Sequence, residues 1–347
     1  MLRSARNDDF SGIGAKPQKN VIASGAKQSM KTKILQMPNK LRFYIIFFLF
    51  FANIPPGFSQ NTVNFADEEY KLTALFNEVN RFAEDEQNAK NNNRIIAMLD
   101  SILKIPASFH YAFADVPIGN VYAPDKSFRV FTWNVIHSSG KYTNYGFLQK
   151  YNKATNTVKV FQLSDNSRSI KNPQTQELKP AQWVGATYYD IVQVKIKEQS
   201  VYTLIGWSPN TTFTQKKIIE TLKFVGDSPI FGVPILELKG KGFQRRLIFE
   251  YSSKHTMMLR YEESKKMIVL DHLAPSDYRY TNIPEFYGPD FSIDGYKFEK
   301  GKWRYKADIN FHAPRSGLVD YLPKKLRNKI VEKRRAKRAP KPAPAAQ

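Results

Sequence analysis

Residues Phe128–Tyr151 read FRVFTWNVIHSSGKYTNYGFLQKY, and this stretch decides the fold class of the chain. Its two halves, Phe128–Val135 and Tyr142–Tyr151, are rich in aromatic and β-branched residues, which favour strands. The residues between them, 138–141, have the composition of a turn. The stretch therefore predicts an antiparallel hairpin.

Segments of similar aromatic and β-branched composition continue along the chain. Further predicted strands are Thr157–Leu163, Tyr188–Ile196, Val201–Trp207, Leu222–Val225, Val233–Leu238, Arg245–Tyr251, Thr256–Tyr261, Met267–Leu273 and Lys302–Tyr305. Asp294-Gly295 suits a two-residue turn and predicts one more hairpin, between Phe291–Ile293 and Tyr296–Glu299. Thr214–Thr221 is predicted as a short turn of helix. About a dozen strands joined by short turns predict a mainly β fold, an antiparallel β-sandwich or open barrel over residues 107–321.

Residues 60–106 have helical periodicity instead. Apolar residues recur at three- and four-residue steps in Ala66–Phe82 and again in Asn93–Lys104. The second pattern stops at Ile105-Pro106, because a residue before proline avoids helical backbone angles. We expect an N-terminal pair of helices packed on the β domain.

Composition excludes several classes of site. The chain has 347 residues and no cysteine, so it has no disulfide, thiolate metal site or cysteine nucleophile. Its net charge of +22 is concentrated at the two ends, with +7 in residues 1–60 and +9 in residues 324–347. Residues 61–323 carry only +6, so we expect no nucleic-acid partner.

Residues 30–59 are predicted to be a signal peptide. Basic residues precede the apolar run Phe43–Ile54, and Gly57 and Ser59 provide small residues for cleavage. An uncleaved anchor or a buried core helix is the alternative. We therefore expect an exported protein, located in the periplasm, on the outer-membrane surface or outside the cell.

The two ends of the chain have no globular pattern. Residues 1–29 are interpreted as an extension upstream of the true start at Met30, with a targeting or regulatory segment as the alternative. Residues 322–347 form a basic tail that ends in a proline–alanine spacer. A solvated tail is expected, and electrostatic contact with an anionic membrane surface or polymer is the alternative.

One group of polar residues is a candidate catalytic or metal-binding site. Asp271 and His272 are adjacent, and Asp277, Asp290 and Asp294 follow them, so a carboxylate–imidazole pair could act as a general base or share a metal. The favoured interpretation is structural, because neighbours on a strand point to opposite faces. The five histidines have no metal-ligand spacing, and no phosphate-loop, dinucleotide or nucleophile-elbow motif occurs. We expect no metal and no cofactor.

The tryptophans are the candidate ligand-binding residues. They are Trp133, Trp183, Trp207 and Trp303. Exposed tryptophans on a β-sandwich could hold sugar rings, but aromatic residues also dominate ordinary β cores. A core role is the favoured interpretation.

Eight motifs of this chain resemble an uncharacterised family of exported proteins from Bacteroidetes-type bacteria. They are FRVFTWN, YGFLQ, GATYYDIV, YTLIGWSPN, KKIIETLKF, LIFEYSS, DHLAPSD and FYGPDFSIDGYKFEKGKW, and they span roughly residues 65–312. The resemblance implies a signal peptide and an envelope location, and it implies no activity or functional residue.

The function expected from the sequence is that of a non-enzymatic envelope module. Its expected partner is a glycan or another envelope protein. A hydrolase with its site around Asp271, His272 and Asp290 is the alternative.

Overall fold

The computed structural model describes residues 63–79 and 84–309. The helices and strands of the described residues belong to one compact unit that begins at Asn64. The predicted extension (1–29), signal peptide (30–59) and basic tail (322–347) lie outside the described residues.

The predicted helix pair is present. It consists of α3 (Phe65–Glu78) and α4 (Asp85–Leu103). Asn64 caps the first helix by accepting a hydrogen bond from the backbone N–H of Ala66 at 3.2 Å. α4 ends just before Ile105-Pro106, as predicted, and the chain then enters a short 3₁₀ helix, η1 (Pro106–His110).

The first sheet contains the hairpin that decided the fold class. Its strands are β1 (Gly119–Tyr122), β2 (Phe128–Ile136), β3 (Tyr142–Asn152) and β4 (Thr157–Ser164), paired antiparallel in that order. Alternation along β2 sends Phe131 and Trp133 toward the helices and Phe128 and Val130 toward the second sheet. Both faces of this sheet are therefore buried.

The second and third sheets complete the β domain. The second has the order β11-β7-β6-β5, with β8 paired to β7: β5 (Thr187–Ile196), β6 (Gln199–Ser208), β7 (Thr214–Val225), β8 (Ser228–Phe231) and β11 (Arg246–Ser252). The third has the order β10-β9-β15-β14-β13-β12: β9 (Leu236–Leu238), β10 (Gly242–Gln244), β12 (Leu259–Glu262), β13 (Met267–Pro275), β14 (Tyr287–Glu299) and β15 (Lys302–Lys306). Pairing is antiparallel except between β9 and β15.

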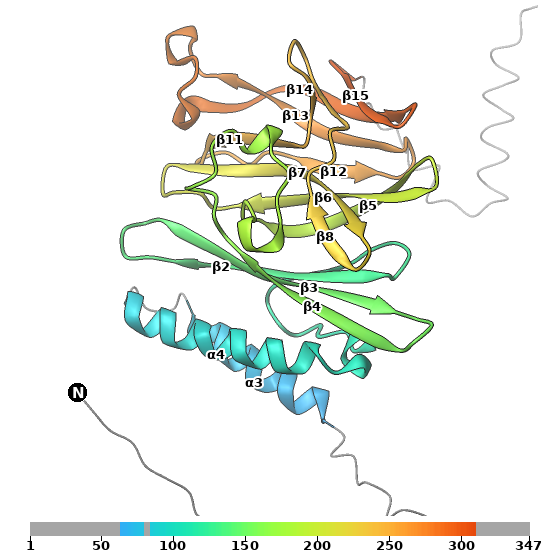
Figure 1. Ribbon diagram of the computed structural model, residues 1–347. Coiled ribbons are helices and arrows are strands. Elements are labelled where there is room, and N and C mark those ends of the chain that lie inside the picture. Colours follow the sequence, from blue (N-terminus) through green and yellow to red (C-terminus); the bar gives the residue numbers. More distant parts are fainter. Residues whose placement is uncertain (1–62, 80–83, 310–347) are drawn as a thin grey trace, which may run out of the picture. The chain divides into compact units, whose positions relative to one another are not determined.

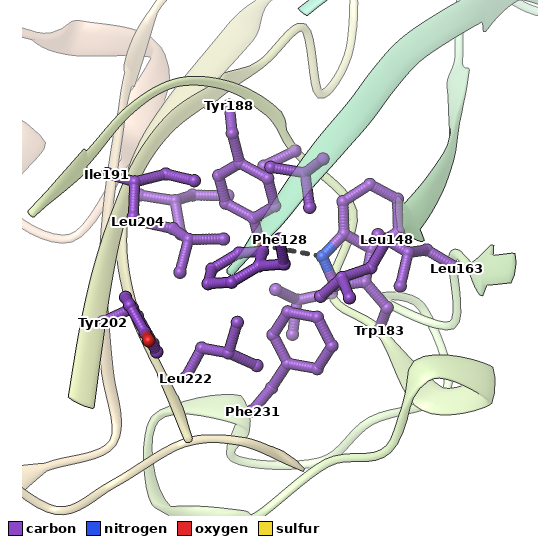
Figure 2. Packing of buried hydrophobic residues seen from close by; sticks show 14 of the residues in the cluster. Phe128, Leu148, Leu163, Trp183, Tyr188, Ile191, Tyr202, Leu204, Leu222 and Phe231 are labelled. Carbon is purple, nitrogen blue, oxygen red and sulfur yellow. Dashed lines mark hydrogen bonds between the residues drawn. The ribbon is translucent and has the colours of Figure 1, made fainter. Parts of the chain in front are cut away.

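Three apolar clusters hold these elements in layers (Figure 1). One joins the helices to the first sheet, a second joins the first sheet to the second, and a third joins the second sheet to the third. Figure 2 shows the middle cluster, in which Phe128 and Leu148 of the first sheet meet Leu204 and Leu222 of the second. The mainly β, antiparallel prediction is confirmed, in a sandwich-like form that does not close into a barrel.

The helix predicted at Thr214–Thr221 is wrong. These residues lie in β7, which pairs with β6 on one side and with β11 on the other. Ile218 and Ile219 face opposite apolar clusters, so this strand is buried on both faces. A doubly buried strand lacks the simple apolar–polar alternation that identifies a strand in sequence.

The hairpin predicted at Asp294-Gly295 is also wrong. Both residues lie inside the continuous strand β14, paired with β13 and β15. A Cβ added to Gly295 would lie 2.5 Å from Cδ1 of Ile309 and 2.8 Å from the carbonyl oxygen of Ile268. This glycine therefore serves close packing, and the turn occurs further on, between β14 and β15.

Candidate functional site

The predicted carboxylate–imidazole group is only partly assembled. Nδ1 of His272 lies 2.8 Å from Oδ2 of Asp290, where a bulge in β14 opposes His272 on β13. Asp271 points elsewhere and accepts a hydrogen bond from the backbone N–H of Met258 at 2.7 Å. Asp271 and His272 thus use opposite faces of the strand, as their adjacency requires.

The His272–Asp290 pair also connects β13 and β14 at the bulge. The backbone N–H and the hydroxyl of Ser292 both donate to Oδ1 of Asp290, at 3.0 and 2.7 Å. Partial burial acts to raise the pKa of Asp290, but the Ser292 and His272 hydrogen bonds outweigh it, so its pKa is lowered. Ser292 contacts the carboxylate and not the imidazole, so a serine–histidine–aspartate relay is not formed.

The four tryptophans belong mainly to the core. Trp133, Trp183 and Trp303 are 4%, 0% and 1% exposed. Their indole N–H groups donate to Asn92, Tyr188 and Thr203, respectively, at 2.7, 2.8 and 2.9 Å. Trp207 is half-buried and donates to Gln215 at 2.6 Å. These positions match the favoured core interpretation and leave the three buried rings no face for a sugar.

The strongest candidate site is a groove at the end of the first sheet where the β1–β2 and β3–β4 turns lie. Its volume is about 940 Å³. It is lined by Phe109, His110, Ala112, Tyr122, Asp125, Lys126, Ser127, Lys150, Tyr151, Asn152, Lys153, Ala154 and Asp227. These residues come from η1 and the segment after it, from the end of β1 and the β1–β2 turn, from the end of β3 and the β3–β4 turn, and from the β7–β8 turn, so the groove exists only in the folded chain.

Aromatic rings form one wall of the groove. The rings of Phe109 and Tyr151 are stacked, with centroids 4.6 Å apart. The ring of Tyr122 meets Phe109 edge to face at 5.5 Å, and the ring of His110 meets Tyr151 the same way at 5.0 Å. Interlocked rings of this kind give a rigid apolar surface that needs no ordering when a ligand binds.

Lysines surround this wall. Nζ of Lys126 lies 4.3 Å from the centroid of the Tyr122 ring. Lys150 is fixed by hydrogen bonds to Asp227 and to the carbonyl of Gly226, at 2.8 and 2.9 Å. Within the described residues, Lys126 and Lys153 form no ion pair, so their charge is available to a ligand.

The two carboxylates of the groove are already engaged. Asp125 accepts hydrogen bonds from Ser127, Gln193 and Tyr202, the last at 2.7 Å. Asp227 bridges Lys150 and Lys159, and the Lys150 and Lys159 hydrogen bonds lower its pKa to about 2. Three lysines and two carboxylates line the groove, so its formal charge is +1.

A buried arginine lies directly behind the aromatic wall. Arg129 on β2 is fully buried, and its Nη1 donates to the hydroxyl of Tyr122 at 2.7 Å. Its remaining hydrogen bonds go to Oε1 of Gln149 and to the carbonyl oxygens of Ser108 and Tyr111. Burial lowers the pKa of Arg129 to about 10, although Tyr122 opposes this.

Arg129 differs from the other fully buried arginine in its partners. Nε of Arg246 donates to the buried carboxylate of Glu220 at 2.7 Å, whereas Arg129 meets no carboxylate within the described residues. Burying a charge costs on the order of several kcal/mol unless an opposite charge accompanies it. Rings around the guanidinium, the nearest that of Phe131 at 4.5 Å, offset only part of this cost. An anion in the groove would supply the missing charge.

The residues of this groove are scattered over four segments with no regular spacing, so no sequence motif identifies them. One signal was present in the first stretch quoted. Arg129 occupies the same alternate positions as Phe131, Trp133 and Val135, so strand alternation alone would have put its charge on the same face as these apolar side chains. A buried arginine of this kind points to a functional hypothesis before the fold is known.

Comparisons with protein-family models, curated proteins and solved structures found no match for this chain. Across residues 63–79 and 84–309, no three acidic or histidine side chains come together as a metal site. In that same part of the chain no helix is both long enough and apolar enough to cross a membrane.

Proposed function

We propose that this chain is an exported, non-enzymatic binding module that holds an acidic glycan in the groove over Arg129. The observation that carries the proposal is a fully buried guanidinium that meets no carboxylate among the described residues and is joined through Tyr122 to the groove wall. The signal peptide expected at residues 30–59 supports an envelope location, where acidic polysaccharides are exposed.

The aromatic residues and the lysines of the groove suit the sugar rings and the carboxylates of such a ligand, respectively. The ring of Tyr151 offers apolar surface to the face of a sugar ring, and Lys126 and Lys153 offer donors to carboxylates. An anion in the groove would be attracted to the buried guanidinium by an energy that decreases as their separation increases. Charge thus favours an acidic glycan over a neutral one.

The experiment is a binding titration that locates the ligand. Purified chain is titrated with an oligouronate, in parallel with the double variant Lys126→Glu/Lys153→Glu and with the control Lys239→Glu. Lys239 is exposed in the β9–β10 turn and does not line the groove. We expect the double variant to bind at least tenfold more weakly and the control to bind like the original chain. Equal affinity for all three would reject the groove as the site.

A second candidate function rests on the His272–Asp290 pair. The 2.8 Å contact between Nδ1 and Oδ2 leaves Nε2 as the nitrogen that could take a proton from water. A hydrolase of this kind predicts turnover of ester, glycoside or peptide substrates that His272→Ala abolishes. Residual turnover in that variant would exclude the pair as the catalytic group.

A further inference from the structure

A small polar pocket lies near the end of β3 that is remote from the groove. Its volume is about 150 Å³. It is lined by Tyr142, Asn144, Ser167, Arg168, Val184, Ser208, Asn210 and Lys216. From Asn144 to Tyr151 along β3 is roughly 23 Å at about 3.3 Å per residue, so the pocket and the groove are separate.

Asn144 has one atom with no partner. The residue is 4% exposed, and its Nδ2 donates to Oδ2 of Asp165 at 2.8 Å and to the hydroxyl of Ser208 at 3.2 Å. Its Oδ1 is buried and receives no hydrogen bond from the described residues. An unpaired buried acceptor costs about 1–3 kcal/mol, so a donor is expected from water or from a ligand.

Gly185, in the segment GATYYDIV, allows this arrangement. A Cβ at this position would lie 2.5 Å from Oδ2 of Asp165 and 2.6 Å from Nδ2 of Asn144. Its φ of +73° is also one that other residues rarely adopt. The backbone therefore approaches the Asn144–Asp165 bond closely and holds the amide in its orientation.

The two carboxylates near the pocket already accept hydrogen bonds from the protein. Asp165 accepts from the backbone N–H groups of Asn144 and Ser167 at 2.9 Å, and Glu250 accepts from Asn210 and Thr214.

The basic side chains make fewer bonds than they can. Nζ of Lys216 donates to Oδ1 of Asn210 at 2.7 Å and lies 3.6 Å from Glu250, and Nη2 of Arg168 donates to the carbonyl of Tyr142. An ammonium has three N–H donors and a guanidinium five. The pocket thus offers several donors, and one of its lining residues, Asn144, carries a buried acceptor without a partner among the described residues.

We propose that this pocket binds a small carboxylate that carries a hydroxyl or amino group, such as a hydroxy acid or an amino acid. The carboxylate accepts from Lys216, Arg168 and the hydroxyl of Ser208, and the hydroxyl or amino group donates to Oδ1 of Asn144. A volume of about 150 Å³ favours a small ligand over an extended one.

The test compares ligands on the unaltered chain by calorimetry or saturation-transfer NMR. L-lactate and L-alanine are each compared with propionate, which lacks the donor, and with methyl lactate, which lacks the carboxylate. We expect lactate or alanine to bind at least tenfold more tightly than both controls. Equal binding of propionate, or binding of none of the acids because the pocket holds water only, would overturn the proposal.

Variants then locate the binding. Arg168→Gln and Lys216→Met should each lower the affinity at least tenfold, whereas Lys241→Met, in the exposed β9–β10 turn, should leave it unchanged. The groove variant Lys126→Glu should also leave it unchanged, so the two proposals can fail separately. Unchanged affinity in both pocket variants would place the ligand elsewhere. The ligand comparison needs no variant and stands even where one does not fold.

Discussion

The hydroxyl of Tyr122 accepts a hydrogen bond from Nη1 of Arg129 at 2.7 Å and donates one to the carbonyl of Phe109 at 2.6 Å. A single hydroxyl thus connects the buried guanidinium, the groove wall and the 3₁₀ helix that follows α4. Its pKa is raised by burial, against the opposing effect of Arg129, so it stays protonated and able to donate at neutral pH.

Tyr122→Phe should lower the free energy of unfolding by about 1–3 kcal/mol, because it removes an acceptor from a buried charged donor. Urea denaturation followed by circular dichroism measures this difference. Tyr278→Phe is the matched control, since Tyr278 is 83% exposed, and it should change stability by less than about 0.5 kcal/mol. An equally small change in Tyr122→Phe would mean that the hydroxyl does not support the guanidinium.

Glu220→Gln should cost about 3–5 kcal/mol, because it leaves the buried guanidinium of Arg246 without its counter-charge. Glu220 also accepts the hydroxyl of Tyr188, so two elements lose a contact. The control is Asp100→Asn, which breaks an exposed pair with Lys104 and should cost about 0–1 kcal/mol. Similar losses in the two variants, measured by urea denaturation, would contradict the importance of the buried pair.

Asp227→Asn should alter stability in acid. Hydrogen bonds from Lys150 and Lys159 hold the folded pKa of Asp227 at about 2, below its ordinary value of 3.8. A carboxylate whose pKa is lower when folded contributes stability above about pH 4 and loses it as pH falls toward 2. The unfolding midpoint of the variant should therefore fall less steeply between pH 4 and 2. An unchanged acid slope would show that the two lysines do not hold this carboxylate.

Gly295→Asn distinguishes a continuous β14 from a hairpin. Within the strand, the added side chain meets Ile309 and the backbone of Ile268, and overpacking should cost about 1–3 kcal/mol. In a two-residue turn asparagine is accepted readily, so no loss would be seen. Lys297→Ala, exposed on the same strand, controls for a change in strand propensity. A stable Gly295→Asn variant would restore the hairpin interpretation.

Sequence alone was sufficient where a helical periodicity, or an aromatic and β-branched composition bounded by turn residues, was present, as in β2, which can be identified although both its faces are buried. The helix pair and the hairpin of β2 and β3 follow from periodicity and turn composition, and both are present. It failed at β7, where burial on both faces removes the alternation, and at Gly295, where close packing and a tight turn both require glycine. Packing against a third sheet depends on contacts distant in sequence, which no local pattern contains.

The candidate site was less predictable than the fold. Asp271 and His272 were candidate site residues because they are adjacent in sequence, but adjacent side chains on a strand point to opposite faces of the sheet. The groove joins residues as far apart as Phe109 and Asp227, which only the folding of two sheets brings together. Arg129 was the one local signal, a charge at a position that alternation assigns to the interior.

The most direct test of the central claim is a pair of calorimetric titrations with one oligouronate and its carboxyl-reduced, neutral counterpart of the same length. A short single-stranded oligonucleotide serves as a second anion without sugar carboxylates. We predict that the oligouronate binds at least tenfold more tightly than both and that its affinity falls as salt rises. Equal affinity for the neutral sugar, or tighter binding of the oligonucleotide, would contradict an acidic-glycan site over Arg129.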